Sequence, residues 1–470
     1  MYLFRNLVIL GVSTYLFGCS THHVPSILQT SPAVKSWAPA VPLSAENNKP
    51  LSTQEDGWFT TGDPTLFKLV NLSQNHNPQL NSIKAQIVQA NAATKVRHTS
   101  PRINLGATSP ISHSTASTSS LNATLNGQIN LEAPLDFWGV NSNLDEIANL
   151  KYKSLLSSFN TARVDLAYDV MGGYLDYRNC IQSLDLTREF VVSSEKTKTL
   201  IEAKTVAGFL AGTDLNRAKG TFADANTTLV TRTEDCDMSL NKLAYLIGLP
   251  VYALKQELGP LTEPPLLIFN SPSGLSANLL RQKPSIKGAE QAFLAADIEL
   301  ANATLARLPV FSIASLISVT TPISPSGTLF KVLGLTPQLG LNLVDNGSIA
   351  ANVSTSQAKV TLAALNYELE LLRSIRDIDN ALSKLASNKL KVDSVDAAVT
   401  QYSAYLDKAS LRYKAGLISL MELEDAKRLV LTTRQKQLSL SLELAQSWIT
   451  LYKSLGGGWP SSTWGSSDAH

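Results

Sequence analysis

The amino-acid sequence predicts an α+β fold of two tandem repeats, each made of a β-hairpin and long coiled-coil helices. Three observations predict it. Short motifs recur at a constant offset, two segments of each half alternate apolar and polar residues, and longer segments carry apolar residues at helical spacing. The 470 residues include 40 Lys and Arg against 38 Asp and Glu, and this near-neutral balance argues against a nucleic-acid-binding protein.

The repeat has an offset of 208 residues. Ala207-Gly208-Phe209 recurs as Ala415-Gly416-Leu417 (415 − 207 = 208). The same offset relates Pro101 to Pro309, Gly139 to Gly347, Asp169 to Asp377 and Gly248 to Gly456. We therefore expect a tandem duplication, with a first repeat at 61–250, a linker at 251–275 and a second repeat at 276–458.

The N-terminus has the pattern of a bacterial export signal. A basic residue precedes the apolar stretch Leu7–Phe17, which is too short to span a bilayer. Leu16-Phe17-Gly18-Cys19 resembles a lipobox, so residues 1–18 are predicted to be removed and Cys19 to be lipidated. An ordinary secretory signal with an incidental cysteine is the alternative. Residues 19–60 are rich in Pro, Ser and Asn and are predicted to form a tether.

Two segments of each half have the period-two alternation of strands. In the first half they cover Ile103–Ala107 and Leu121–Leu131, with a hairpin loop around His113–Ser120. In the second half the alternating apolar residues are Phe311, Ile313, Ile317 and Val319, then Leu335, Leu339, Leu341 and Leu343. A transmembrane helix over Val310–Thr321 is the competing interpretation, but it would have only twelve residues, against about 20 needed to span a bilayer.

A long helix is expected after each hairpin. In the first half it runs from Asn141 to Val206, and its apolar stripe includes Leu155, Phe159, Ala162, Leu166, Val170, Gly173, Tyr177, Cys180 and Leu184. Its 66 residues would extend roughly 100 Å. Gly208 then ends it, and an antiparallel return helix follows. The second half repeats the pattern, with a helix from about Ala350 to Lys414 and a return helix ending near Leu455. Residues 459–470 are a C-terminal tail.

Two cysteines flank the first turn symmetrically. Cys180 and Cys236 each lie 28 residues from Gly208 (208 − 180 and 236 − 208), so they should stand at the same height on facing helices. An oxidising compartment would then favour a disulfide between them, worth about 4 kcal/mol by loop-closure entropy. Two free thiols, or pairing with another chain, are the alternatives.

Four amphipathic strands per chain cannot close a barrel, because the smallest bacterial barrels have about 8 strands. Copies of the chain must therefore pair the free edges. Two copies would give 8 strands and three would give 12, and periodicity does not choose between them.

Several motifs together resemble the TolC-type outer-membrane factor family, in the lipoprotein, NodT-like branch that serves resistance-nodulation-division efflux pumps. They are Asn77-Pro78-x-Leu80, Leu135-Asp136-Phe137-Trp138-Gly139, Leu279-Leu280-Arg281-x-Lys283-Pro284, Arg412-Tyr413-x-Ala415-Gly416-Leu417 and Leu455-Gly456-Gly457-Gly458-Trp459. The resemblance covers nearly the whole chain after the tether. It implies a homotrimer with a 12-strand outer-membrane β-barrel, continued by an α-helical barrel in the periplasm.

The resemblance implies a passive exit duct in the outer membrane. A periplasmic adaptor and an inner-membrane pump of the resistance-nodulation-division type would supply small toxic compounds or drugs, and outer-membrane lipid would surround the strands. An outlet for type I protein or peptide secretion is the first alternative, and a periplasmic coiled-coil adaptor is the second. A lipoprotein enzyme is disfavoured, because no zinc-type spacing, P-loop, dinucleotide fingerprint or nucleophile elbow is present. No catalytic, cofactor or metal site is predicted.

The resemblance also implies functional residues at the helical tips. Thr213, Asp214 and Tyr413 fall on positions that resemble the periplasmic gate, where a carboxylate facing a phenol makes a strong hydrogen bond. Ile418 departs from the family pattern, which has a basic residue there. Asp214 could alternatively cap the return helix.

The two turns themselves resemble the surface that adaptors grip. The residues concerned are Gly208, Phe209, Gly416 and Leu417.

Overall fold

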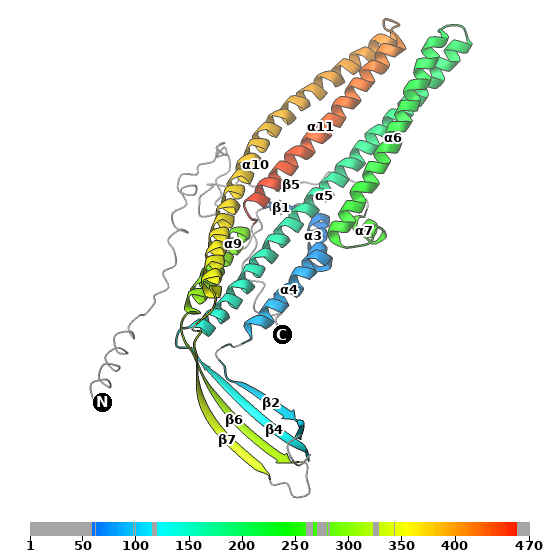
Figure 1. Ribbon diagram of the computed structural model, residues 1–470. Coiled ribbons are helices and arrows are strands. Elements are labelled where there is room, and N and C mark those ends of the chain that lie inside the picture. Colours follow the sequence, from blue (N-terminus) through cyan, green and yellow to red (C-terminus); the bar gives the residue numbers. More distant parts are fainter. Residues whose placement is uncertain are drawn as a thin grey trace. The chain divides into compact units, whose positions relative to one another are not determined.

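The computed structural model in Figure 1 describes residues 59–61, 63–96, 98, 100–114, 120–259, 267–269, 280, 283–322, 329–342 and 344–457. The predicted signal peptide, the lipidation site Cys19, most of the tether and the C-terminal tail lie outside the described residues.

The two halves of the chain contain the same order of long elements. In the first half the structure has β1 (Phe59–Thr61), α3 (Pro64–His76), α4 (Pro78–Thr94), β2 (Arg102–Thr108), β3 (Ile111–Ser114), β4 (Ser120–Leu135), α5 (Val140–Val206) and α6 (Gly212–Ile247). In the second half it has α7 (Val251–Leu258), β5 (Leu267–Phe269), α9 (Pro284–Leu305), β6 (Val310–Pro322), β7 (Phe330–Gly340), α10 (Ser348–Lys414) and α11 (Leu420–Ser454). Helices α5 and α10 each have 67 residues and begin 208 positions apart (348 − 140).

Five of the described strands form one antiparallel sheet in the order β2-β4-β6-β7, with β3 also paired to β4. Strands β4 and β6 lie at its centre and join the two repeats (Figure 1). The predicted start of the hairpin loop at His113 is wrong, because His113 and Ser114 belong to strand β3. Strands β2 and β3 pair with β4 in one continuous register and are separated at Pro110, which has no backbone N–H to add to the ladder.

The segment Val310–Thr321 is strand β6 and not a helix. Within the described residues, none of the helices combines the length and the apolar character needed to cross a bilayer.

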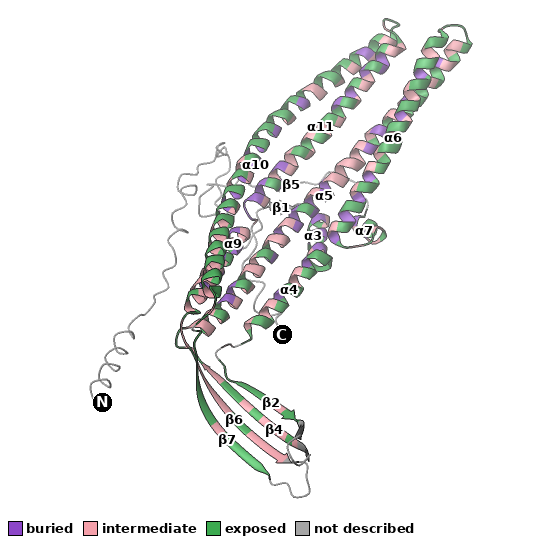
Figure 2. Cartoon of the chain, viewed as in Figure 1, coloured by how far each residue is buried: buried purple, intermediate pink, exposed green. Residues whose placement is uncertain are grey.

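The long helices form two antiparallel hairpins, α5 with α6 and α10 with α11 (Figure 1). Helix α9 packs against both α5 and α10, and α11 packs against α5, so the hairpins lie side by side. Figure 2 shows buried residues spaced along one side of these helices, as coiled-coil packing requires. The largest fully buried side chains are Tyr174, Tyr452, Phe159 and Phe293.

The junction of α3 and α4 is fixed by Asn77, which is buried. Its Oδ1 accepts hydrogen bonds from the backbone N–H groups of Gln79 and Leu80 and so caps α4. Its Nδ2 donates to the carbonyl oxygen of Leu246 at 2.8 Å, which attaches this junction to the end of α6.

Helices α3 and α7 and strands β1, β3 and β5 were not predicted. Strand β1 pairs with β5, and α7 precedes β5 in the segment 251–275 that we expected to be a plain linker. Strands β1 and β5 have three residues each, too few to show a period.

Candidate functional site

The sheet has one apolar face. Residues directly opposite one another in neighbouring strands point to the same side, and one such row crosses all four strands. It consists of Leu105, Ile129, Ile317 and Leu333, and all four are exposed.

The other face of the sheet is mostly polar. Its residues include Asn104, Asn126, Gln128, Asn130, Ser318, Thr320 and Gln338, with Val310, Leu316, Phe330 and Val332 as large apolar exceptions. A sheet with these two faces can separate an apolar phase from water. Strands β2 and β7 end the sheet and leave two edges for pairing.

Aromatic side chains lie where the sheet meets the helices. The indole Nε1 of Trp138 donates a hydrogen bond to the carbonyl oxygen of Pro309 at 2.8 Å. The rings of Phe137 and Phe311 meet edge to face, with centroids 5.2 Å apart. These contacts connect the end of β4 to the start of β6 and therefore join the two repeats.

A carboxylate closes the start of each long helix. Asp136 accepts hydrogen bonds from the backbone N–H groups of Asn141 and Ser142 at the start of α5. Asp345 accepts from the N–H of Ile349 at 2.8 Å at the start of α10. Both negative charges lie at helix N-termini, where the helix dipole favours them.

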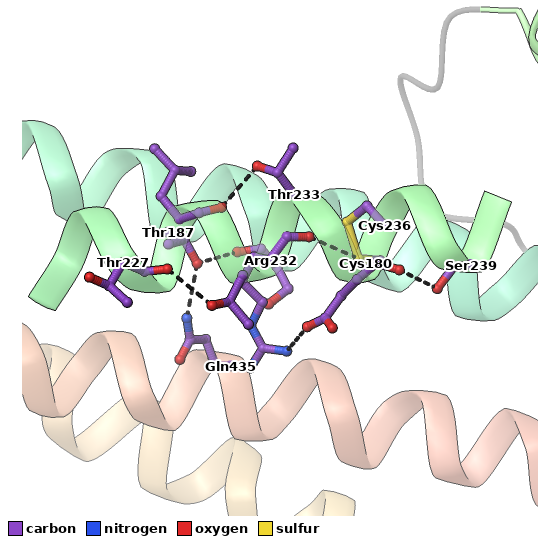
Figure 3. A network of polar contacts seen from close by, with 12 residues as sticks. Cys180, Thr187, Thr227, Arg232, Thr233, Cys236, Ser239 and Gln435 are labelled. Carbon is purple, nitrogen blue, oxygen red and sulfur yellow. Dashed lines mark hydrogen bonds and ion pairs between the residues drawn. A yellow bond between two sulfur atoms is a disulfide. The ribbon is translucent and has the colours of Figure 1, made fainter. Parts of the chain in front are cut away.

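A disulfide joins α5 to α6. Cys180 and Cys236 are bonded, with Cα atoms 5.4 Å apart, and lie on facing helices as the sequence predicts (Figure 3).

The two hairpins meet along a seam of polar contacts between α5 and α11. At the sheet end of this seam, the Nζ of Lys453 lies 2.8 Å from Asp169 and 3.5 Å from Asp165. Burial lowers the pKa of Lys453, but the two carboxylates outweigh burial and the net effect raises that pKa. These three side chains line a cavity of about 890 Å³.

Further along the seam, Gln446 donates to Asp176 at 2.5 Å. Gln435 donates to Thr187 at 3.3 Å, which Figure 3 shows beside the disulfide. The pairs hold α11 at one register along α5.

Both helical turns use the same backbone geometry. Gly208 and Gly416 have φ values of 79° and 73°, a left-handed conformation that favours glycine. The N–H groups of Phe209 and Leu417 donate to the carbonyl oxygens of Lys204 and Arg412, five residues back, which is the Schellman closure of a helix. The side chains of Phe209 and Leu417 are exposed. Each turn therefore presents one large apolar side chain.

The structure does not bring the three predicted gate residues together within one chain. Tyr413 packs against a buried cluster of Ala409, Leu423 and Ala426. In the described part of the chain, no hydrogen bond joins its hydroxyl to Asp214. The Nζ of Lys204, on the neighbouring hairpin, lies 5.9 Å from the centroid of its ring.

Asp214 is the third residue of α6, and Thr213 beside it is exposed. The residue at the helix cap is Ala211, and no side chain makes a capping hydrogen bond there. The hypothesis that the Asp214 side chain caps α6 by a hydrogen bond is therefore wrong. Its negative charge still lies in the first turn of α6, where the helix dipole favours it.

A second ion pair connects the hairpins near their tips. Arg217 of α6 lies 3.5 Å from Asp425 of α11. The two residues occupy the same position of the repeat (425 − 217 = 208) with opposite charges.

Among the described residues, no group of three His, Cys, Asp or Glu side chains is arranged to hold a metal ion. The geometry offers a two-faced sheet, a helical stalk and charged tips. A channel through a membrane could be built from these parts.

Comparison with known families decides the identity. The sequence profile described as outer membrane efflux protein matches residues 69–249 and 275–457. The chain belongs to the outer membrane efflux protein family.

Individual members of this family match over most of their length. The chain is 23% identical over 413 residues to the cation efflux system protein CusC of Escherichia coli O157:H7, covering 86% of this chain and 89% of that protein. It is 24% identical over 409 residues to nodulation protein T of Rhizobium leguminosarum bv. trifolii, covering 86% and 87%. The CmeC outer membrane channel of Campylobacter jejuni has the same fold, with a TM-score of 0.79, 19% identity and coverage of 90% and 92%.

Lys204, Arg217 and Asp425 of this efflux protein were not predicted from the sequence as site residues. Opposite charges at one repeat position are a signal that aligning the two halves would have shown for the last two. No signal in the sequence identifies Lys204, because it meets Tyr413 only through the packing of two hairpins.

Proposed function

We propose that the protein is the outer-membrane exit duct of a tripartite efflux system. In this role it passively passes small toxic compounds from an inner-membrane pump and a periplasmic adaptor to the exterior. The observation that carries the proposal is the two-faced sheet, whose strands β4 and β7 lead directly into the long helices α5 and α10. Family membership supports the same role, and relatives are named as efflux proteins for cations and for solvents.

The sheet argues that copies of the chain pair with one another, and the family resemblance supports three copies. The sheet's edge strands β2 and β7 carry unpaired backbone groups, and such groups are expensive in hydrocarbon. Pairing β7 of one copy with β2 of the next removes the edges, and three copies give a barrel of 12 strands. The apolar row then faces outer-membrane lipid and the polar face lines the duct.

The helical hairpins would extend into the periplasm, so that most of the chain lies there. The exposed Phe209 and Leu417, each beside its turn glycine, are the proposed adaptor contacts. Thr213, Asp214 and Tyr413 are the proposed gate. Because Asp214 and Tyr413 do not bond within one chain, the gate contact would form between copies. Lipidation of Cys19 would add a membrane anchor.

Single-channel conductance of the detergent-extracted protein in planar bilayers tests the proposal. Wild type should give small, mostly closed currents, and Asp214→Ala combined with Tyr413→Phe should raise the open fraction. The matched control is Asp224→Ala combined with Tyr252→Phe, which removes the same groups from exposed positions away from the tips. No pore in any of the three proteins would refute the duct, and equal currents in both double variants would refute the gate.

A further inference from the structure

The cavity of about 890 Å³ beside Lys453 is lined by charged side chains. Its lining comes from α5, α6, α10 and α11 and from the start of α9. The five carboxylates in the lining are Asp165, Asp169, Asp176, Glu370 and Asp377. In a narrow passage, so much negative charge alone would repel anions.

Lysines in the same lining offset most of this charge. The four lysines are Lys242, Lys283, Lys384 and Lys453. Lys453 pairs with two of the carboxylates, and the Nζ of Lys242 lies 3.5 Å from Asp176. Lys384 has no ion pair within the described residues. The cavity therefore has a formal net charge of only −1 per chain (4 − 5).

The cavity lies on the side of α5 that faces away from α3. Helix α3 meets α5 at Tyr174, whose hydroxyl donates a hydrogen bond to the capping residue Asp63. Asp176 and Asp165 lie two and nine residues from Tyr174, which places them roughly 160° and 180° around the helix. The cavity and α3 therefore occupy opposite sides of α5.

The cavity also crosses the full width of one copy. The helices contact one another in the order α6, α5, α11 and α10, and the lining reaches from Lys242 on α6 to Lys384 on α10. The lining is therefore a broad face of the paired hairpins and not one of their two edges.

In the proposed ring of three copies, one of the two broad faces must border the bore. On the α3 side, α3 packs against α7 and β1, and β1 pairs with β5. Three copies of this group inside the ring would obstruct the bore, whereas outside the ring they have free space. The charged cavity is then the face along which exported compounds pass.

We propose that this cavity is the charge filter of the duct, and that its four lysines hold it near neutrality so that anionic as well as cationic compounds pass. This inference rests on the proposed function and adds the chemical class of the cargo. Three copies would place 15 carboxylates (3 × 5) and 12 lysines (3 × 4) around the bore. The small negative excess gives only a slight preference for cations.

The influence of these charges depends on salt. The screening length is about 10 Å at 0.1 M ionic strength and about 3 Å at 1 M. A filter made of wall charges should therefore act on passing ions at low salt and lose most of its effect at high salt.

Reversal potentials of the full-length, detergent-extracted protein in planar bilayers under a KCl gradient test the proposal. Lys453→Gln and Lys384→Gln each change the net charge of the cavity from −1 to −2 per chain. Lys384→Gln breaks no described ion pair, so it tests the filter even if loss of Lys453 weakens the fold. The matched control is Lys255→Gln, which removes the same charge from an exposed position on α7.

We expect both cavity variants to raise the ratio of cation to anion permeability at least about twofold at about 0.1 M salt, and the rise to vanish near about 1 M. Lys255→Gln should match the wild type. Conducting pores in which neither cavity variant changes the ratio would overturn the filter and leave the duct standing, as would a wild-type pore that excludes chloride. No pore in any of the four proteins would overturn both.

Discussion

The disulfide between Cys180 and Cys236 should make a measurable contribution to stability. The perturbation is the double substitution of both cysteines by serine, which leaves the two helices otherwise unchanged. The bond joins residues 56 positions apart, and closing a loop of about 57 residues lowers the entropy of the unfolded chain by about 14 cal/mol/K. At 298 K this corresponds to about 4 kcal/mol per chain.

The effect on the unfolding temperature follows from chain length. At about 2.1 cal/mol/K per residue, the entropy of unfolding 470 residues is about 1 kcal/mol/K. If the whole chain unfolds together, a loss of about 4 kcal/mol in stability therefore lowers the unfolding temperature by about 4 °C. A larger loss would indicate that the α5–α6 hairpin unfolds on its own.

Scanning calorimetry of both proteins at one scan rate, with and without reductant, measures this loss. Reductant should lower the wild-type midpoint to that of the double variant and leave the variant unchanged. Equal midpoints for the two oxidised proteins would refute the reasoning, as would labelling of both cysteines by a maleimide in unreduced, unfolded wild type.

Three further predictions concern the helical region. Because the folded pKa of Lys453 is raised above its ordinary value of 10.5, its ion pairs stabilise the protein fully below that pH and are lost as pH rises through the folded pKa. In chemical unfolding, the difference in free energy of unfolding between wild type and Lys453→Gln should therefore be constant from about pH 7 to 9 and shrink above about pH 10.5. A difference that stays constant up to about pH 12 would exclude the ion pairs as its source. Tyr174→Phe should destabilise the protein by about 1.5 to 3 kcal/mol, because its buried hydroxyl donates a 2.6 Å hydrogen bond to the carboxylate that caps α3, and hydrogen exchange should rise in α3 first. Gly248→Ala should lower the free energy of unfolding by more than about 2 kcal/mol, because Gly248 has a φ of 80° and a Cβ there would lie 2.7 Å from the carbonyl oxygen of His76. The control is Gly220→Ala, at an open position within α6, which should stabilise the protein slightly.

The sequence by itself determined the repeating frame of this protein. The 208-residue offset, the glycines at the two turns and the alternating strands predict α5 nearly to the residue and β6 to within three residues, whereas β7 ends at Gly340, before Leu341 of the predicted return strand. The long helix predicted from Asn141 to Val206 begins one residue earlier in the structure. These features depend on local periodicity and on backbone conformations that only glycine adopts readily, so they can be read along the chain.

Only the tertiary structure decided which surfaces meet. It placed α11 on α5 and α9 against both α5 and α10. It also brought Lys204 to the ring of Tyr413 across two hairpins and paired β1 with β5. The periodicity of an amphipathic helix shows that a face must be covered but does not say by which helix, because that choice depends on contacts between residues far apart in the chain.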